Sequence, residues 1–200
     1  IGRLGGAPLA FAEPWLEPAF LEAWLARRDL RDPWQEGNNI VNLASFLLLT
    51  CRDTALRDRA ETALDLLIDW HLRLVEPATG FWGVDQFSDP IRLLHAMAGA
   101  THNYHLFYAL RHPVPFFDKA VDYCLSRDPA VSSACIDVDV VDILACAHRL
   151  TDHRRGDIET WFHTFLPRLL DFQNADGGFA DETEGIRRFD GWVGGYEEPQ

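Results

Sequence analysis

The chain has 200 residues, of which 48% are hydrophobic and 12% aromatic, and its formal net charge is −13. This apolar content suffices for a sizeable core, so the composition excludes an intrinsically disordered chain. Nucleic acids and anionic membrane surfaces attract basic patches, and the acidic balance argues against both as partners. No apolar run is long enough to cross a bilayer, so we expect no transmembrane segment.

The first half of the chain predicts amphipathic and buried helices in alternation. An amphipathic helix is expected over residues 14–28. Asp32-Pro33 has the pattern of an N-cap followed by proline in the first helical turn, and the helix that it opens is largely apolar. Residues 53–75 carry charges on one face only, which predicts an outer helix with one solvated side. A turn rich in glycine and aromatic residues follows at residues 77–83.

The second half repeats this order. Asp89-Pro90 and Asp128-Pro129 each open a mostly apolar helix, and each of these helices is followed by an amphipathic one. The amphipathic helices are expected over residues 116–125 and 157–173. A second Gly-aromatic turn comes next, and residues 185–200 are expected to form a loop.

A unit of two helices and roughly 50 residues is typical of helical-hairpin arrays. We therefore predict an all-α fold and a single domain over residues 1–200, an α/α toroid with the apolar helices as an inner ring. An open solenoid is the alternative arrangement. The chain begins at Ile1 and ends just after a loop-like stretch, so we expect a truncated fragment. Its last hairpin would lack a neighbour and leave apolar surface around Val140, Ile143 and Leu150, which predicts marginal stability and association.

Residues 95–108, with the sequence HAMAGATHNYHLFY, have the composition of a helix that lines a pocket. The small residues at its start permit close approach of another helix or a ligand, and uncharged polar groups follow among aromatic ones. In a toroid the start of each inner helix faces a central cavity. We expect these polar side chains to converge there from three hairpins: Asn38, Asn39, Asn42, His102, Asn103, His105, Asp137 and Asp139.

The second turn carries a family resemblance. Its sequence, QNADGGF over residues 173–179, resembles the Q-x-x-D-G-G-F turn of squalene-cyclase-like proteins and protein prenyltransferase β subunits. The sequence TGFWG over residues 79–83 is similar to a looser copy of it. The resemblance implies an α/α toroid and a domain of the squalene-cyclase or prenyltransferase type that acts on an isoprenoid.

The segment DVDVVD over residues 137–142 resembles the D-x-D-D acid of class II terpenoid cyclases, although Val140 stands at the last acidic position. A buried carboxyl beside a second carboxylate can hold a proton at neutral pH, as such an acid must. The resemblance thus implies that Asp137 and Asp139 are catalytic. The alternative is that these two carboxylates brace helix ends inside the ring.

Prenyltransferase β subunits hold zinc through Asp, Cys and His, and this chain departs from their D-x-C order because Cys135 precedes Asp137. His102 and His105 lie three residues apart on one helical face and could join Cys135 as ligands. Such spacing is common by chance, so we expect neither a metal nor another cofactor.

Amide and imidazole side chains favour a different function. Toroidal polysaccharide lyases neutralise a uronate carboxylate with Asn and move protons with His or Tyr. In this chain the amides would be Asn38 and Asn39, and His102 and Tyr104 would be catalytic. The alternative is that these groups hydrogen-bond one another in a polar core.

Aromatic residues in the expected loops have two interpretations. Phe81, Trp82, Phe179 and Trp192 could stack on a sugar ring or cover an apolar substrate, and Trp82 is the one that we assign to substrate binding. Alternatively, these rings plug the ends of the hairpins.

Three functional hypotheses follow, and whether the chain is catalytic stays open among them. The first is an isoprenoid-directed toroid, the second a carbohydrate-active toroid, and the third a non-catalytic scaffold that binds a small molecule or a partner protein. A small molecule or a sugar would occupy the central cavity. The four cysteines form no C-x-x-C pair, which favours free thiols in a reducing, cytoplasmic compartment.

Overall fold

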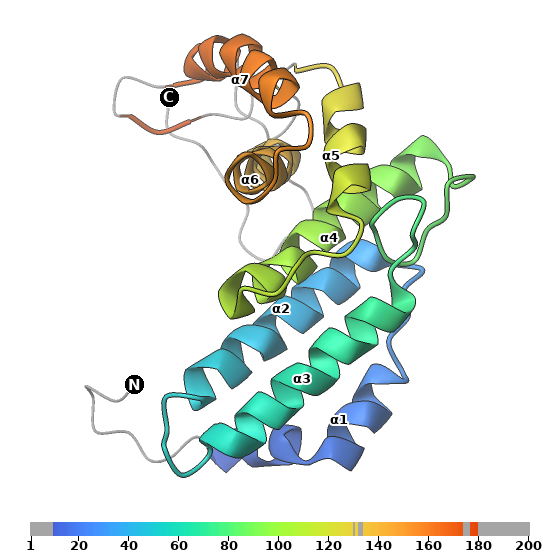
Figure 1. The fold of residues 1–200 in the computed structure, drawn as a ribbon, viewed down its shortest axis with the longest axis vertical. Coiled ribbons are helices and arrows are strands. Elements are labelled where there is room, and N and C mark those ends of the chain that lie inside the picture. The colour runs from blue at the N-terminus through green and yellow to red at the C-terminus, as the bar shows by residue number, and fades with distance from the viewer. Residues whose placement is uncertain (1–9, 130, 132–133, 174–176, 180–200) are drawn as a thin grey trace, which may run out of the picture. The chain divides into compact units, whose positions relative to one another are not determined.

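The computed structural model describes residues 10–129, 131, 134–173 and 177–179, and this part of the chain is all-α (Figure 1). It divides into two compact units, Ile1–Ala120 and Val121–Gln200, which are described separately below. No helix in the described part is long and apolar enough to cross a membrane. The elements are the 3-10 helix η2 (Ala10–Leu16) and the α-helices α1 (Pro18–Leu25), α2 (Pro33–Thr50), α3 (Arg57–Leu74), α4 (Pro90–Leu110), α5 (Phe117–Ser126), α6 (Ala134–Leu150) and α7 (Arg155–Leu170).

Two of the predicted helix starts are confirmed with their capping chemistry. The Asp32 carboxylate accepts a hydrogen bond from the backbone N–H of Gln35 at 3.1 Å. The Asp89 carboxylate accepts from the N–H groups of Ile91 and Arg92, both at 3.0 Å. In each case a proline without an N–H follows the cap, where a free donor would otherwise remain.

Two boundaries differ from the prediction. The expected helix over residues 14–28 is two elements, because Pro18 lacks the N–H that a continuous helix would need and instead starts α1. The Asp128-Pro129 pair does not open α6, which begins at Ala134. The side chain of Arg168 on α7 donates to the Asp128 carboxylate at 3.4 Å and to the Pro129 carbonyl at 2.9 Å. The Asp128-Pro129 pair is therefore bonded to α7, the helix that follows α6.

In the first unit, α2 and α4 run side by side in the same direction and α3 returns antiparallel to them (Figure 1). Glycines let α2 and α4 come into backbone contact. A Cβ atom on Gly37 would lie 2.5 Å from the carbonyl oxygen of Gly99, and one on Gly99 would overlap the carbonyl of Pro33. The small residues at the start of α4 therefore accommodate another helix, one of the two occupants expected from the sequence.

The turn after α3 is a buried plug. Val75 and Trp82 form an antiparallel β-bridge, and Gly80 adopts a φ of 76°, which favours glycine. Trp82 is only 1% exposed, and its indole N–H donates to the carbonyl of His71 at 3.0 Å. Tyr104 on α4 donates its hydroxyl to the Gly80 carbonyl at 2.7 Å. Helix α4 thus holds the turn in place.

The second unit contains a hairpin of α6 and α7 with a small core of its own. Ile143, Leu144, Ile158 and Phe165 are all buried. The expected open surface is found at Leu150, which is exposed, but Val140 and Ile143 are buried. Leu166 and Leu170 on α7 are exposed as well. Residues 185–200, including Trp192, lie outside the described residues.

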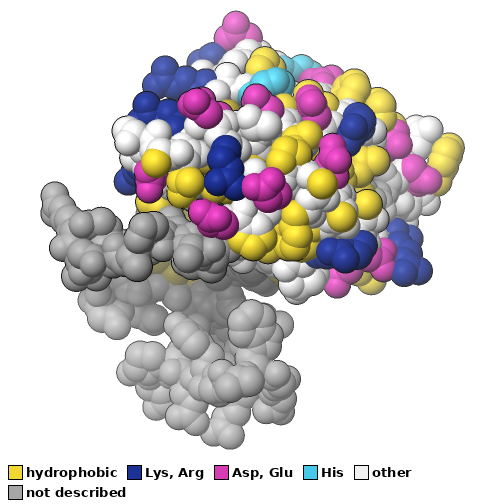
Figure 2. Space-filling view, turned by 90° about the horizontal axis from the view of Figure 1, so that it is seen from below, with side chains coloured by type: hydrophobic (Ala, Val, Ile, Leu, Met, Phe, Trp, Pro, Cys, Tyr) yellow, Lys and Arg dark blue, Asp and Glu magenta, His cyan; other side chains and the backbone are white. Residues whose placement is uncertain are grey.

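Acidic, basic and apolar side chains are interspersed among the described residues on the face seen in Figure 2. This distribution matches the mixed composition of the solvated helix faces. Three of the four cysteines, Cys51, Cys124 and Cys146, are described, and all three are free thiols. Burial raises the pKa of the Cys124 thiol to about 12, so this thiol is not a reactive group at neutral pH.

Candidate functional site

A pocket of about 310 Å³ lies in the first unit between α2 and the segment formed by η2 and α1. Indole, guanidinium and amide groups line it together with apolar side chains. Its lining residues are Trp15, Trp24, Arg28, Asn39, Asn42, Leu43 and Phe46.

Arg28 is held in this pocket by three contacts. Its Nε donates to the Trp24 carbonyl at 3.2 Å, and its guanidinium carbon lies 4.0 Å from the centre of the Trp24 ring. Its Nη1 forms an ion pair with Glu36 Oε2 at 3.2 Å. These contacts use Nε and one N–H of Nη1, and the remaining N–H groups of the fork stay free of acceptors among the described residues.

Glu36 is the buried carboxylate behind the pocket and is only 8% exposed. It stands in the first turn of α2 because Asp32-Pro33 starts the helix just before it. Besides Arg28, it accepts hydrogen bonds from the backbone N–H of Asp29 and from Asn39 Nδ2, each at 3.2 Å. One carboxylate therefore orients both the guanidinium and one of the pocket amides.

Two of the three predicted asparagines reach the pocket. Asn39 and Asn42 line it, three residues apart on α2. Asn42 is exposed and has no hydrogen bond to another described residue, so its amide is free to bind a ligand. Asn38 points elsewhere, because its Nδ2 donates to the carbonyl of Trp34 in its own helix at 3.3 Å.

The predicted residues of α4 are divided between core and surface. Asn103 and Tyr104 are buried, His102 is half-buried and His105 is exposed. Burial and the nearby His105 lower the pKa of His102, so this imidazole is neutral at physiological pH. None of the four lines the pocket formed by α1 and α2. Trp82, assigned to substrate binding, is buried in the plug and packs against Tyr104.

His71 is a buried polar residue that the sequence analysis did not single out. It lies on the apolar face of α3, and its Nδ1 donates to the carbonyl of Leu67 at 2.6 Å. Burial lowers the pKa of His71 to about 4, so the side chain is neutral at physiological pH. The rings of Trp70, Trp82 and Phe107 all lie edge-on to its imidazole, so His71 is part of the core. In the sequence, His71 falls four residues after Leu67 and so on the apolar face of the expected helix, a position that indicates burial.

The predicted acids lie on α6 in the second unit. Asp137 and Asp139 are both buried, while Val138 between them is 59% exposed. Asp139 also helps to raise the pKa of the buried Cys124 thiol, after the larger effect of burial. The expectation that these carboxylates share a cavity with Asn39 and His102 stays a prediction, since the two units are described separately.

No metal cluster emerges from the described residues: no three His, Cys, Asp or Glu side chains lie close enough together to bind an ion. The side chain of Cys135, one of the ligands considered above, lies outside the described part of the chain.

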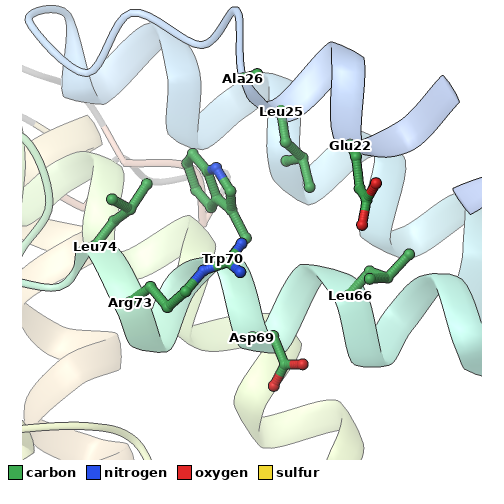
Figure 3. Close-up of a pocket in the computed structure, with 8 residues that line it drawn as sticks. All are labelled: Glu22, Leu25, Ala26, Leu66, Asp69, Trp70, Arg73 and Leu74. Carbon is green, nitrogen blue, oxygen red and sulfur yellow. The ribbon is translucent and has the colours of Figure 1, made fainter. Parts of the chain in front are cut away.

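A second pocket, of about 410 Å³, separates α1 from α3 (Figure 3). Leu25 from α1 and Trp70 and Leu74 from α3 point into the space between the two helices, and the charged groups of Glu22, Asp69 and Arg73 border it. No residue predicted from the sequence lies here. The pocket is larger than the first, and its lining combines aliphatic side chains with an indole and three charged groups but contains no amide. The pocket formed by α1 and α2 holds two amides and two indoles and is taken as the candidate site.

Comparisons with protein-family models, curated proteins and solved structures found no match to this chain.

Proposed function

We propose that this chain is a carbohydrate-binding domain built from helical hairpins, and that a saccharide occupies the pocket lined by Arg28, Asn39 and Asn42. The observation that carries the proposal is the combination in one open pocket of two amides, a guanidinium and two indoles. Sugars present hydroxyl groups around an apolar ring face, and planar polar side chains beside aromatic ones complement both.

The toroid arrangement belongs to the same proposal. In the first unit α2 and α4 run parallel to each other and α3 runs antiparallel to both. The inner and outer helices of a hairpin array would have these directions, which supports the toroid. The two Gly-aromatic turns add support because both close an antiparallel bridge after an outer helix, Val75 with Trp82 and Gln173 with Phe179.

The pocket supports a saccharide-binding function better than a catalytic one. A glycosidase needs a carboxylic acid and a second carboxylate on either side of the scissile bond. The lining residues of this pocket include neither, and Glu36 behind it already accepts hydrogen bonds from Arg28, Asp29 and Asn39. We therefore propose a binding domain that requires no cofactor, in the cytoplasm, where free thiols persist.

The proposal is tested by isothermal titration calorimetry with a panel of oligosaccharides. We expect Asn42→Ala to weaken binding about tenfold, the effect of losing one well-placed hydrogen bond of ~1.4 kcal/mol. Asn38→Ala is the matched control, since it removes the same side chain from the same helix outside the pocket. Equal affinities of the two variants, or no binding by any saccharide, would contradict the proposal.

A second candidate is the isoprenoid-directed domain that the resemblance implies. Its specific support is the burial of Asp137 and Asp139 on α6, the environment that a catalytic acid needs. Incubation with squalene or a prenyl diphosphate, followed by mass spectrometry, tests it. Conversion that is lost in Asp139→Asn would favour this candidate over the saccharide-binding domain.

A further inference from the structure

We infer that the pocket selects a neutral saccharide and discriminates against uronates and other acidic sugars, because Glu36 already neutralises Arg28. This inference rests on the proposed function and adds to it the class of ligand. It runs opposite to the chemistry of a lyase, in which the site must attract a sugar carboxylate.

The charge balance of the pocket is the first argument. Arg28 is the one cationic side chain among the lining residues, and none of the others is charged. Its partner Glu36 lies at 3.2 Å, and the two side chains are 17% and 11% exposed, so water and salt screen the pair only weakly. A sugar carboxylate that approached Arg28 would meet a guanidinium whose charge is compensated, with a second carboxylate directly behind it.

The hydrogen-bonding pattern is the second argument. The amide of Asn42 offers one acceptor and two donor hydrogens, and Arg28 contributes further N–H donors. Hydroxyl groups are donors and acceptors at once and can satisfy both kinds of partner. A carboxylate is an acceptor alone, so it can use only the N–H donors of Asn42 and Arg28, and the amide oxygen of Asn42 would then need a donor from elsewhere.

The electrostatic field of the whole chain also disfavours acidic sugars. Its 31 acidic and 18 basic residues give a net charge of −13, which slows the approach of any anion. A single neutralised guanidinium does not reverse this field. Neutral ligands are unaffected by it, and their binding should therefore depend little on ionic strength.

The experiment compares two ligand sets on the unmutated chain by calorimetry. Neutral oligomers of glucose, xylose and mannose form one set, and oligogalacturonates and oligoglucuronates of equal length form the other. We expect at least one neutral oligomer to bind and the acidic ones to bind at least about tenfold more weakly. Acidic oligomers that bind as tightly as the neutral ones, or more tightly, would overturn the inference and leave the proposed function standing. Failure of both sets would overturn the proposed function and the inference with it.

A charge-removing variant tests the cause of the selectivity. In Glu36→Gln the shape of the side chain is kept and the charge of Arg28 is exposed, so affinity for oligouronates should rise about tenfold relative to neutral oligomers. Glu61→Gln is the matched control, because it removes the same charge from an exposed position on α3 and should leave the ratio unchanged. Circular dichroism establishes that both variants are folded. An unchanged ratio in folded Glu36→Gln would refute the role of the ion pair, and an unfolded variant leaves the comparison of ligand sets as the deciding test.

Discussion

The two Gly-aromatic turns share a local pattern and differ in their surroundings. Both follow an amphipathic helix and both close an antiparallel bridge. Trp82 in the first turn is 1% exposed, whereas Phe179 in the second is 47% exposed. The first turn is covered by Tyr104 and Phe107 of α4, which pack against Trp82. The comparison teaches that the turn sequence determines the backbone bridge, while the neighbouring hairpin determines how far the aromatic ring is buried.

Truncation of the two aromatic rings should separate these contributions most strongly. We expect Trp82→Ala to cost about 3–5 kcal/mol of unfolding free energy, because it leaves a cavity in a fully packed site. Phe179→Ala should cost less than about 1 kcal/mol, as is usual for a half-exposed position. Urea denaturation followed by circular dichroism measures both. Similar losses for the two variants would show that burial in the first turn contributes little.

A matched pair of glycines gives the next largest effect. Gly99→Ala places a methyl group against the carbonyl of Pro33, and we expect a loss of about 1–3 kcal/mol from overpacking. Gly156→Ala on α7 adds the same methyl group where nothing lies within 4 Å, and it should stabilise its helix by a few tenths to about 1 kcal/mol. We predict that the melting temperature falls in Gly99→Ala and rises in Gly156→Ala. A neutral Gly99→Ala variant would contradict the close packing of α2 against α4.

His71 predicts an acid dependence of stability for the first unit. Its pKa is lowered from 6.5 to about 4 on folding, so the unfolded chain binds more protons between these values and stability falls as the pH falls. From pH 7 to pH 5 we expect a loss of about 2 kcal/mol. In His71→Gln this component of the pH dependence should disappear, as measured by urea denaturation at each pH. A slope identical to that of the unmutated chain would mean that another group titrates.

The stability of the second unit should depend on pH more weakly than that of the first unit, and over a lower pH range. Burial raises the pKa of Asp122 on α5, but hydrogen bonds from His153 and Arg154 outweigh it and hold the pKa below its ordinary value. The contribution of this pair to stability is therefore present above about pH 4 and is lost as the pH falls through the folded pKa. We expect Asp122→Asn to cost less than about 1 kcal/mol at pH 7, and less at high salt, because Asp122 and its two partners are partly exposed. A cost that persists in 1 M salt would argue against an electrostatic origin.

Local chemistry explains which parts of the fold were predictable. The starts of α2 and α4 follow from Asp-Pro capping, which involves neighbouring residues alone. The third Asp-Pro pair has the same local pattern but binds Arg168, forty residues along the chain, and no local pattern predicts such a contact. The break at Pro18 also has a local cause, because proline lacks the N–H that a continuous helix requires.

The candidate site was predictable to a lesser degree. The sequence singles out Asn39 and Asn42 by their place in the polar first half of an expected inner helix, and both line the pocket. Trp24 and Arg28 come from a segment that reads only as amphipathic, and their role depends on the packing of α1 near α2. The Arg28–Glu36 pair is a tertiary contact, since the chain turns between two helices to form it.

The most direct test of saccharide binding is a ¹H–¹⁵N NMR titration of the chain with the neutral oligomer that binds best. We predict that the side-chain amide signals of Asn39 and Asn42 and the indole N–H signals of Trp15 and Trp24 shift together with one dissociation constant. The indole signals of Trp70, in the pocket between α1 and α3, and of Trp161, in the second unit, should stay in place. Shifts confined to Trp70 or Trp161, or no shifts at saturating ligand, would contradict the assignment of saccharide binding to the pocket of Arg28, Asn39 and Asn42.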